Sequence, residues 1–302
     1  MNISRRRFAQ TLATAAFGAM SPKFALASKG AKQSPDKLNL SCMVWRIGDI
    51  LDFDKQVEWI ASAGFESISF HASAGEPGKW RGIEPAAADR KERRRIRSLL
   101  ARFAVREIHA PFDVKIQPET PASILEKLEE VLKFAGDVGG TVVTVHADPP
   151  AQNKKTSATA WHKALDRLDA AAAATGLRIG LELNRGFEWL REPRRRQVGA
   201  TLDVGHMYLR DGAGFRPYGT VGNLIRFLDR DLFHLHLHDY DGQSDHIEIG
   251  TGQVDFGDCL KALDDIGFRG ALCLELNPDR CQPEGIRRSA DYLRKRAAKM
   301  NQ

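Results

Sequence analysis

Histidines and acids in this 302-residue chain fall where short apolar segments end. They are His71, His109, His146, Glu182, Asp203 and Glu275, with His206 and His246 in the stretches that follow. In Phe233–His238, three histidines alternate with apolar residues, so their imidazoles share one face of an extended strand. Imidazoles and carboxylates bind divalent metals and transfer protons. The pattern predicts a metal-dependent enzyme.

The flanking leucines indicate which way the acids point. Leu181 and Leu183 flank Glu182, and Leu274 and Leu276 flank Glu275, so the acids face away from the leucines. Buried carboxylates need an opposite charge or a metal ion. We predict that one ion is held by three carboxylates and one imidazole: Glu182, Asp203, His236 and Glu275. This donor set suits Mn²⁺, Mg²⁺ or Co²⁺.

Further imidazoles leave the number of metal ions open. Additional ligands could come from His109, His146, His206 and His246. Such a nitrogen-rich set favours Zn²⁺ in a multinuclear site. The alternative is a hydrogen-bonded polar network that holds no metal.

Eight apolar segments rich in β-branched residues must position these side chains. They are Leu40–Trp45, Ser67–His71, Val105–Ala110, Val142–His146, Ile179–Asn184, Ala200–Asp203, Phe233–His238 and Ala271–Asn277. Segments with helical period alternate with them, and the fifth unit, 186–197, has room for only a short helix. This order predicts an α/β fold, a single-domain (β/α)₈ TIM barrel over residues 38–302. Barrels of this kind carry their chemistry at the C-terminal ends of the strands.

The intervening helices have clear ends. We predict them at Phe53–Ala63, Lys91–Phe103, Ala122–Val138, Thr159–Thr175, Val221–Leu228, Gly257–Ile266 and Ile286–Met300. Gly64, Gly139, Gly176 and Gly267 each follow a helix at the position where glycine commonly ends one.

The N-terminus has the pattern of an export signal. Arg5, Arg6 and Arg7 precede Phe8, a weakly apolar run follows, and Ala25-Leu26-Ala27 gives a small-residue cleavage site. This segment resembles a twin-arginine (Tat) signal peptide, predicting a signal over 1–27, a linker over 28–37 and the Tat machinery as a partner. The resemblance implies a periplasmic or extracellular location. The apolar run is too short to span a membrane.

The charge argues against a polyanionic partner. Four of the six net positive charges come from Arg5, Arg6, Arg7 and Lys23, so residues 28–302 carry only about +2. We therefore expect no nucleic-acid partner.

Several short motifs, taken in order, resemble one superfamily. They are Gly180–Asn184, Thr201–His206, His236–Asp239, His246–Phe256 and Leu274–Pro278. Together they are similar to the xylose-isomerase-like TIM barrels, which include sugar phosphate isomerases and epimerases and the endonuclease IV-like AP endonuclease family 2.

The epimerase branch implies a role for each matching residue. By this resemblance Glu182 and Glu275 form an acid/base pair on opposite faces of the sugar, and His206 contacts the substrate. We expect His71 and His238, the remaining strand-end histidines, to bind substrate. The implied protein is an exported, divalent-metal-dependent isomerase or epimerase acting on a small carbohydrate or keto-sugar through an enediolate.

Three alternatives remain. The nuclease branch implies a zinc-dependent phosphoester hydrolase whose ligands match His109, His146, Glu182, Asp203, His206, His236, His246 and Glu275. One position departs from that pattern, since Ser244 stands where that branch has an aspartate and Asp245 is one place off. A keto-glycoside lyase could use the same site. A non-catalytic sugar binder would lack one acid of the proton-transfer pair.

Overall fold

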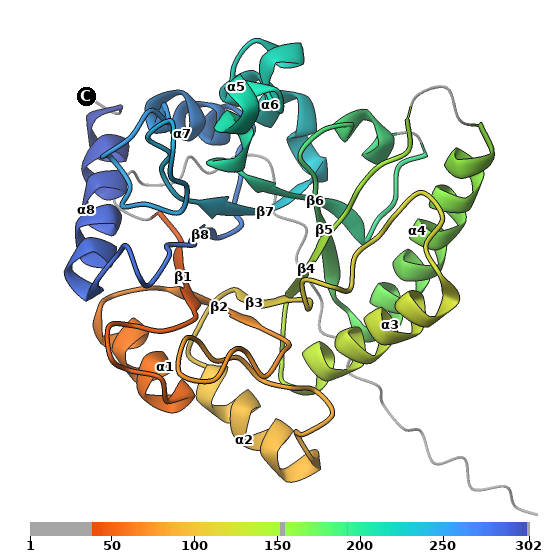
Figure 1. Ribbon diagram of the computed structural model, residues 1–302, viewed down its shortest axis with the longest axis horizontal. Coiled ribbons are helices and arrows are strands. Elements are labelled where there is room, and N and C mark those ends of the chain that lie inside the picture. The colour runs from red at the N-terminus through yellow and green to blue at the C-terminus, as the bar shows by residue number, and fades with distance from the viewer. Residues whose placement is uncertain (1–37, 152–154, 192, 301–302) are drawn as a thin grey trace, which may run out of the picture. The chain divides into compact units, whose positions relative to one another are not determined.

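The computed structural model describes residues 38–151, 155–191 and 193–300, which belong to one compact unit. Eight parallel strands pair in chain order and close into a barrel (Figure 1). They are β1 (Leu40–Val44), β2 (Ser67–His71), β3 (Arg106–His109), β4 (Val142–His146), β5 (Arg178–Glu182), β6 (Val198–Asp203), β7 (Leu232–Leu237) and β8 (Leu272–Leu274). The TIM barrel prediction is confirmed.

Helices surround the strands. The main ones are α1 (Phe53–Ser62), α2 (Arg90–Leu100), α3 (Ala122–Asp137), α4 (Lys155–Thr175), α6 (Val221–Leu228), α7 (Phe256–Asp265) and α8 (Pro283–Lys299). The fifth unit has only the 3₁₀ turn η1 (Phe187–Leu190), as its length predicted. Between β6 and α6 lie the short elements η2 (His206–Tyr208), α5 (Leu209–Gly212) and η3 (Arg216–Tyr218), and η4 (Asp229–Asp231) precedes β7.

Local chemistry explains where these helices begin and end. The side chains of Asp52, Asp89 and Thr220 accept hydrogen bonds from the first turns of α1, α2 and α6. Four predicted helix-ending glycines, Gly64, Gly139, Gly176 and Gly267, all have positive φ between 64° and 79°. This backbone conformation is strained for residues that carry a Cβ.

The interior of the barrel is polar. Inside it, the Ser41 hydroxyl lies 2.9 Å from that of Ser69, and Thr144 lies 2.9 Å from Thr201. The second contact spans β5 because Gly180 has no side chain there; a Cβ would lie 2.0 Å from the Thr201 hydroxyl. The apolar residues of the same strands, such as Ile68, Val143 and Leu202, are buried in one core with residues of the helices. The predicted alternation is therefore confirmed, and every inward polar group needs a partner.

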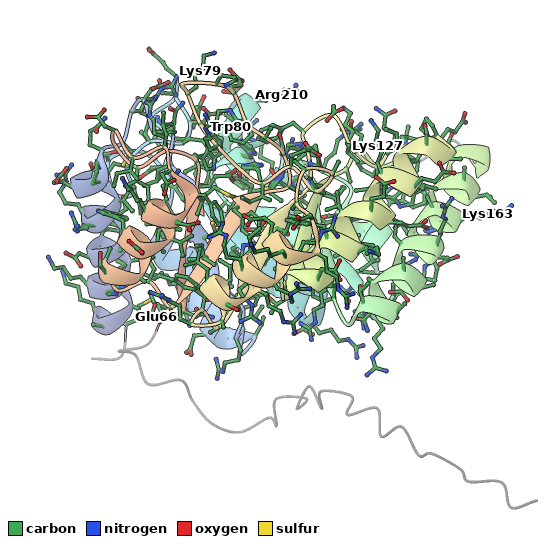
Figure 2. The ribbon with its side chains drawn as sticks, turned by 90° about the horizontal axis from the view of Figure 1, so that it is seen from below. Glu66, Lys79, Trp80, Lys127, Lys163 and Arg210 are labelled. Atoms are coloured by element: carbon green, nitrogen blue, oxygen red, sulfur yellow. The ribbon has the colours of Figure 1, made fainter. Side chains whose placement is uncertain are left out.

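The two ends of the barrel differ in their loops. In Figure 2, Trp80, which follows β2, and Arg210, which follows β6, lie at one end, whereas Glu66, which precedes β2, lies at the other. The C-terminal ends of the strands therefore open toward the Trp80 loop.

The signal peptide over 1–27 and the linker over 28–37 lie outside the described residues. Among the helices that are described, none combines the length and the apolar character needed to cross a membrane.

Candidate active site

The predicted site residues gather at the C-terminal end of the barrel. His71, His109, His146, Glu182 and Asp203 are the last residues of β2 to β6, and His236 lies in β7. His238 and Glu275 follow β7 and β8 by one residue, because these strands end earlier than predicted. His206 begins η2, and His246 lies in the loop before α7.

His236 is the centre of the predicted metal set. Its Nδ1 lies 2.9 Å from Glu275 Oε2 and 3.5 Å from Glu182 Oε2. One ligand atom from each of Asp203, His236 and Glu275 lies within 4.8 Å of the others. Glu182 falls in a neighbouring group with His109 and His236, so the two groups share His236. The role of these four side chains as ligands of one metal ion stays a prediction.

The donor atoms of this set are buried against one another. Glu275 Oε2 lies 2.9 Å from His236 Nδ1, whereas Glu182 Oε2 lies 3.4 to 3.5 Å from ring nitrogens of His109, His146 and His236. A buried carboxylate held only by such long contacts is costly, so a bound cation would relieve that cost. Three carboxylates and one imidazole form a predominantly oxygen donor set that suits Mn²⁺, Mg²⁺ or Co²⁺.

A second group of donors lies beside the first. Ligand atoms of Asp203, His206, His238 and His246 fall within 4.8 Å of one another. His206 Nδ1 lies 3.0 Å from Asp203 Oδ2 and 3.4 Å from Glu182 Oε1, so it touches both groups. Asp245, one place from the expected aspartate position, lies 3.4 Å from His246 Nδ1 and 4.0 Å from His206 Nε2.

His238, a member of this second group, uses both ring nitrogens in contacts with other residues. His238 Nδ1 lies 2.8 Å from the His246 backbone N–H, which can only donate, although the Asp239 carbonyl is also 3.1 Å away. In a neutral imidazole, Nε2 then carries the proton and faces Asp203 Oδ1 at 3.0 Å. His238 is thereby placed to orient Asp203 rather than to bind a metal.

The polar cluster keeps its acids ionised and its central imidazoles protonated. Burial alone would raise the pKa of Glu182, but surrounding imidazoles, led by His109, hold it well below its ordinary range. Burial alone would also raise the pKa of Glu275, but the neighbouring His236 imidazole lowers it to about 2. For His206, Asp203 and Glu182 overcome burial and raise its pKa to about 10.

These shifts predict the pH dependence of stability in the metal-free protein. The contribution of His206 is complete below its ordinary pKa of 6.5 and is lost as the pH rises toward 10. The contribution of Glu275 is complete above its ordinary pKa of 4.5 and is lost as the pH falls toward 2. The unfolding temperature should therefore peak between pH 4.5 and 6.5.

Differential scanning calorimetry of protein that a chelator has freed of metal tests this prediction. We expect the unfolding temperature to fall on the order of 5 °C between pH 6.5 and 9.5. The fall should be smaller in His206→Gln. An unfolding temperature that stays constant over this range would contradict the assigned ion pairs.

An aromatic wall closes one side of the site, and the sequence analysis missed most of it. The ring of Phe112, which is 45% exposed, lies 4.8 Å from His71 and 5.6 Å from His146 by ring centroids. Trp80 lies 5.0 Å from His71, and Trp45 lies 5.4 Å from it. The only signal in the sequence was position, since Trp45 ends the first predicted strand and Trp80 and Phe112 follow the second and third.

His71 is held neutral inside this wall. Burial first, and then His109, lower its pKa well below the ordinary value. Neither of its ring nitrogens has a hydrogen-bond partner among the described residues. A neutral imidazole with free donor and acceptor atoms can bind a hydroxyl group.

Asp239 fastens the loop that carries His246. Its buried carboxylate accepts hydrogen bonds from the backbone N–H groups of Tyr240, Gly250, Gly252 and Val254, at 2.9 to 3.1 Å. Gly252 permits this approach, since a Cβ there would lie 2.4 Å from Asp239 Oδ1. The motif residues beyond His246 thus have a structural role in positioning the loop.

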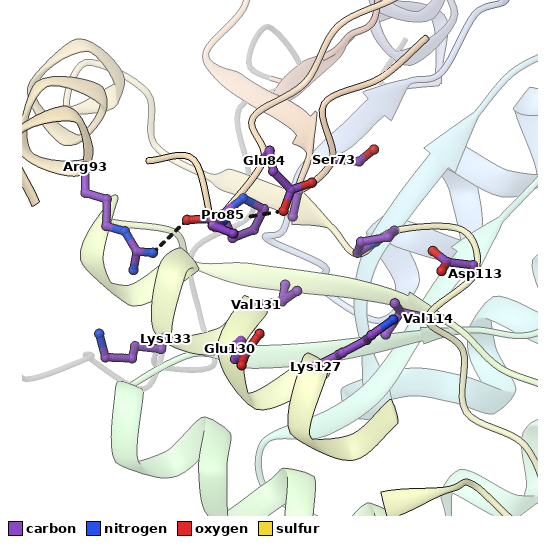
Figure 3. Close-up of a pocket in the computed structure, with 13 residues that line it drawn as sticks. Ser73, Glu84, Pro85, Arg93, Asp113, Val114, Lys127, Glu130, Val131 and Lys133 are labelled. Carbon is purple, nitrogen blue, oxygen red and sulfur yellow. Dashed lines mark hydrogen bonds between the residues drawn. The ribbon is translucent and has the colours of Figure 1, made fainter. Parts of the chain in front are cut away.

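A separate cavity of about 570 Å³ lies outside the strand-end cluster. Its lining comes from the loops after β2 and β3 and from α3, including Ser73, Glu84, Asp113 and Lys127 (Figure 3). Arg93 donates a 2.8 Å hydrogen bond to the Pro85 carbonyl there. The predicted site residues do not line this cavity.

A closed barrel with acids and histidines at the C-terminal ends of its strands is typical of TIM barrel enzymes. Similarity to known proteins identifies the family. Residues 57–296 match the family described as Xylose isomerase-like TIM barrel, and the chain belongs to this family. Among solved structures, a xylose isomerase domain protein from Planctomyces limnophilus has a TM-score of 0.69 at 19% identity, covering 87% of this chain and 97% of that one. A 3-keto-D-glucoside 4-epimerase from E. coli has a TM-score of 0.64 at 14% identity, covering 86% and 100%. Such likenesses show the fold.

Curated relatives match over part of their length. A ketose 3-epimerase of Arthrobacter globiformis is 27% identical over 124 residues, which is 37% of this chain and 39% of that protein. An L-ribulose 3-epimerase of Methylomonas sp. is 28% identical over 180 residues, which is 52% of this chain and 58% of that protein. An uncharacterized protein of Methanocaldococcus jannaschii is 25% identical over 199 residues, covering 56% and 63%.

Proposed function

We propose that this protein is a divalent-metal-dependent sugar epimerase or isomerase acting on a small ketose or keto-sugar. The observation that carries the proposal is the pair of buried carboxylates, Glu182 and Glu275, whose oxygens lie 3.5 Å and 2.9 Å from the same atom, His236 Nδ1. Partial matches to ketose and L-ribulose 3-epimerases support the same reaction type.

The carboxylates move the proton in this reaction. One of them, Glu275 or Glu182, removes the proton from the carbon beside the carbonyl, and the electron pair moves to the carbonyl oxygen to give an enediolate. The other carboxylate returns a proton to the opposite face, which inverts that carbon. His206, protonated beside Asp203, donates to a substrate oxygen. A divalent ion held by Glu182, Asp203, His236 and Glu275 would supply Lewis acidity at the carbonyl.

The aromatic wall supports a sugar-sized substrate. Phe112 presents a half-exposed ring whose centroid lies 4.8 Å from that of the buried His71, and neither ring nitrogen of His71 has a hydrogen-bond partner among the described residues. An apolar face beside a few convergent polar groups is typical of small-molecule sites. We assign His71 to the binding of a substrate hydroxyl and Phe112 to contact with the sugar ring.

Phe112→Ala should weaken substrate binding without stopping the chemistry. Loss of a partly exposed aromatic contact is worth about 1.4 kcal/mol, so we expect KM to rise about tenfold and kcat to change less than about threefold. Steady-state kinetics on the best ketose measures both constants, with Phe112→Tyr as the matched control that keeps the ring. An unchanged KM in Phe112→Ala would remove Phe112 from the binding surface.

The proposed function is tested by proton exchange. The protein is incubated in D₂O with a panel of free ketoses and 3-keto-glycosides, and deuterium at the carbon beside the carbonyl is followed by NMR. We expect incorporation together with formation of the epimer or isomer. Incorporation into none of these compounds by metal-loaded protein would overturn the proposal. Loss of the glycosidic group instead of epimerisation would identify the keto-glycoside lyase.

A second candidate function, zinc-dependent phosphoester hydrolysis, is favoured by one observation. His206, His246 and Asp245 stand beside the first donor set and could bind a further ion. The commitment of His238 Nε2 to Asp203 weighs against it. Elemental analysis of protein purified without added metal distinguishes the two: about one Mn, Mg or Co per chain supports the epimerase, and two or more zinc ions support the hydrolase.

We propose further that the protein is exported by the Tat machinery and acts in the periplasm or outside the cell. The support is the order of arginines, apolar run and small-residue site over residues 1–27. Fractionation of cells followed by N-terminal sequencing tests it. Cleavage after Ala27 in the exported fraction is expected, whereas an uncleaved cytoplasmic protein would overturn this proposal.

A further inference from the structure

Glu107 lies beneath the proposed metal site, and neither the sequence motifs nor the proton-transfer step accounts for it. It belongs to β3, points into the barrel two residues before His109, and has no exposed surface. A fully buried carboxylate requires partners that compensate for lost hydration.

Both partners of Glu107 come from β7. Its Oε1 lies at hydrogen-bond distance, 2.8 Å, from His236 Nε2, and its Oε2 lies 2.7 Å from His234 Nε2. The two histidines are separated by one leucine, so they share the inward face of the strand. One carboxylate therefore bridges two imidazoles, and only one of these, His236, also faces the carboxylates above.

The hydrogen bond decides which nitrogen of His236 is free. A carboxylate accepts, so Nε2 must carry the proton that it donates to Glu107. In neutral His236 the lone pair then belongs to Nδ1, which is the atom that faces Glu275 and Glu182. A negative charge behind a ligating imidazole fixes its tautomer and orientation and makes it a stronger donor.

We propose that Glu107 is a positioning residue that holds His236 with Nδ1 directed at the metal, and so sets the affinity of the site. This inference rests on the proposed metal-dependent function. Glu107 contacts neither the substrate nor the ion, and it acts only through His236.

The test compares Glu107→Gln with the equally conservative Thr144→Val. The glutamine keeps the size of Glu107 and can still accept from His236, but it removes the charge. Thr144 is another wholly buried polar residue of the barrel interior, and its hydroxyl contacts Thr201 instead of the site. Each protein is first freed of metal with a chelator, and Mn²⁺ is then titrated in. We expect Mn²⁺ to bind about 10- to 100-fold more weakly to Glu107→Gln than to the wild type. Binding to Thr144→Val should change less than about threefold by the same measure.

Two results would overturn the inference alone: equal Mn²⁺ affinity of Glu107→Gln and wild type, or equal weakening in both variants. Absence of Mn²⁺, Mg²⁺, Co²⁺ and Zn²⁺ binding by the wild type would instead overturn the proposed function together with the inference.

A measurement on the unmodified protein covers the case in which Glu107→Gln does not fold. NMR of ¹⁵N-histidine-labelled wild type loaded with Zn²⁺, which is diamagnetic, reports the state of each ring nitrogen. We expect His236 to show a protonated Nε2 and a metal-bound Nδ1. A metal-bound Nε2, or a His236 without metal, would overturn the role of Glu107.

Discussion

Glu275→Gln is expected to lower kcat for epimerisation by about 10²- to 10⁴-fold or more. The amide has the same shape as the carboxylate but cannot accept the proton from the substrate carbon. Deuterium incorporation beside the carbonyl should be lost with it. The barrel should remain folded, because the change affects one side chain at the open end of β8 rather than a backbone contact.

The matched control for this variant is Glu248→Gln. Glu248 is in the loop after β7, where it pairs with Arg288 at 2.6 Å, and it is not one of the converging carboxylates. The Glu248→Gln variant should retain activity. Metal content is measured in both variants, because Glu275 is also a proposed ligand. Full activity in Glu275→Gln would remove Glu275 from proton transfer.

Removal of the bound metal is expected to reduce activity at least 100-fold, on the order of one general catalytic interaction. Without a cation, Glu182 and Glu275 face the imidazoles in closed ion pairs, and substrate oxygens lose their positive partner. Mn²⁺ or Co²⁺ at about 1,000 times its Kd should restore activity and stabilise the fold by about 4 kcal/mol, which raises the unfolding temperature by roughly 8 °C or more.

Dialysis against a chelator, followed by elemental analysis and assay, provides the measurement. Re-addition of metal controls for irreversible damage during dialysis. Retention of full activity by protein that contains no detectable metal would contradict the Lewis-acid role and would leave the carboxylate pair as the whole catalytic apparatus.

The fold could be predicted, and so could the gathering of the candidate site residues at one end of the barrel, because alternating polar and apolar residues show which side chains face inward. In β7 and the residue after it, leucines separate His234, His236 and His238, so the inward face is readable from the sequence alone. Glu182 and Asp203, the last residues of β5 and β6, have apolar neighbours in the chain, so their inward direction is readable in the same way. Predicted strand ends were less accurate at His238 and Glu275, where pairing with the neighbouring strands stops one residue earlier.

Residues whose roles depend on contacts across the barrel could not be predicted in this way. Glu107 sits in the strand Arg106–His109, with a charged residue on one side, and nothing in the sequence shows that β7 supplies its two partners. Phe112 and Asp239 lie beyond strand ends, where loop conformation decides direction. Asp245 reaches His206 and His246 although its spacing departs from the expected pattern, because the loop positions it.

The attachment of the loop after β7 limits how far His246 can move during turnover. This loop cannot open without breaking the three hydrogen bonds that the backbone N–H groups of Gly250, Gly252 and Val254 donate to Asp239. His246 is therefore part of a cross-linked segment. Any displacement of His246 during turnover would have to carry residues 250–254 with it.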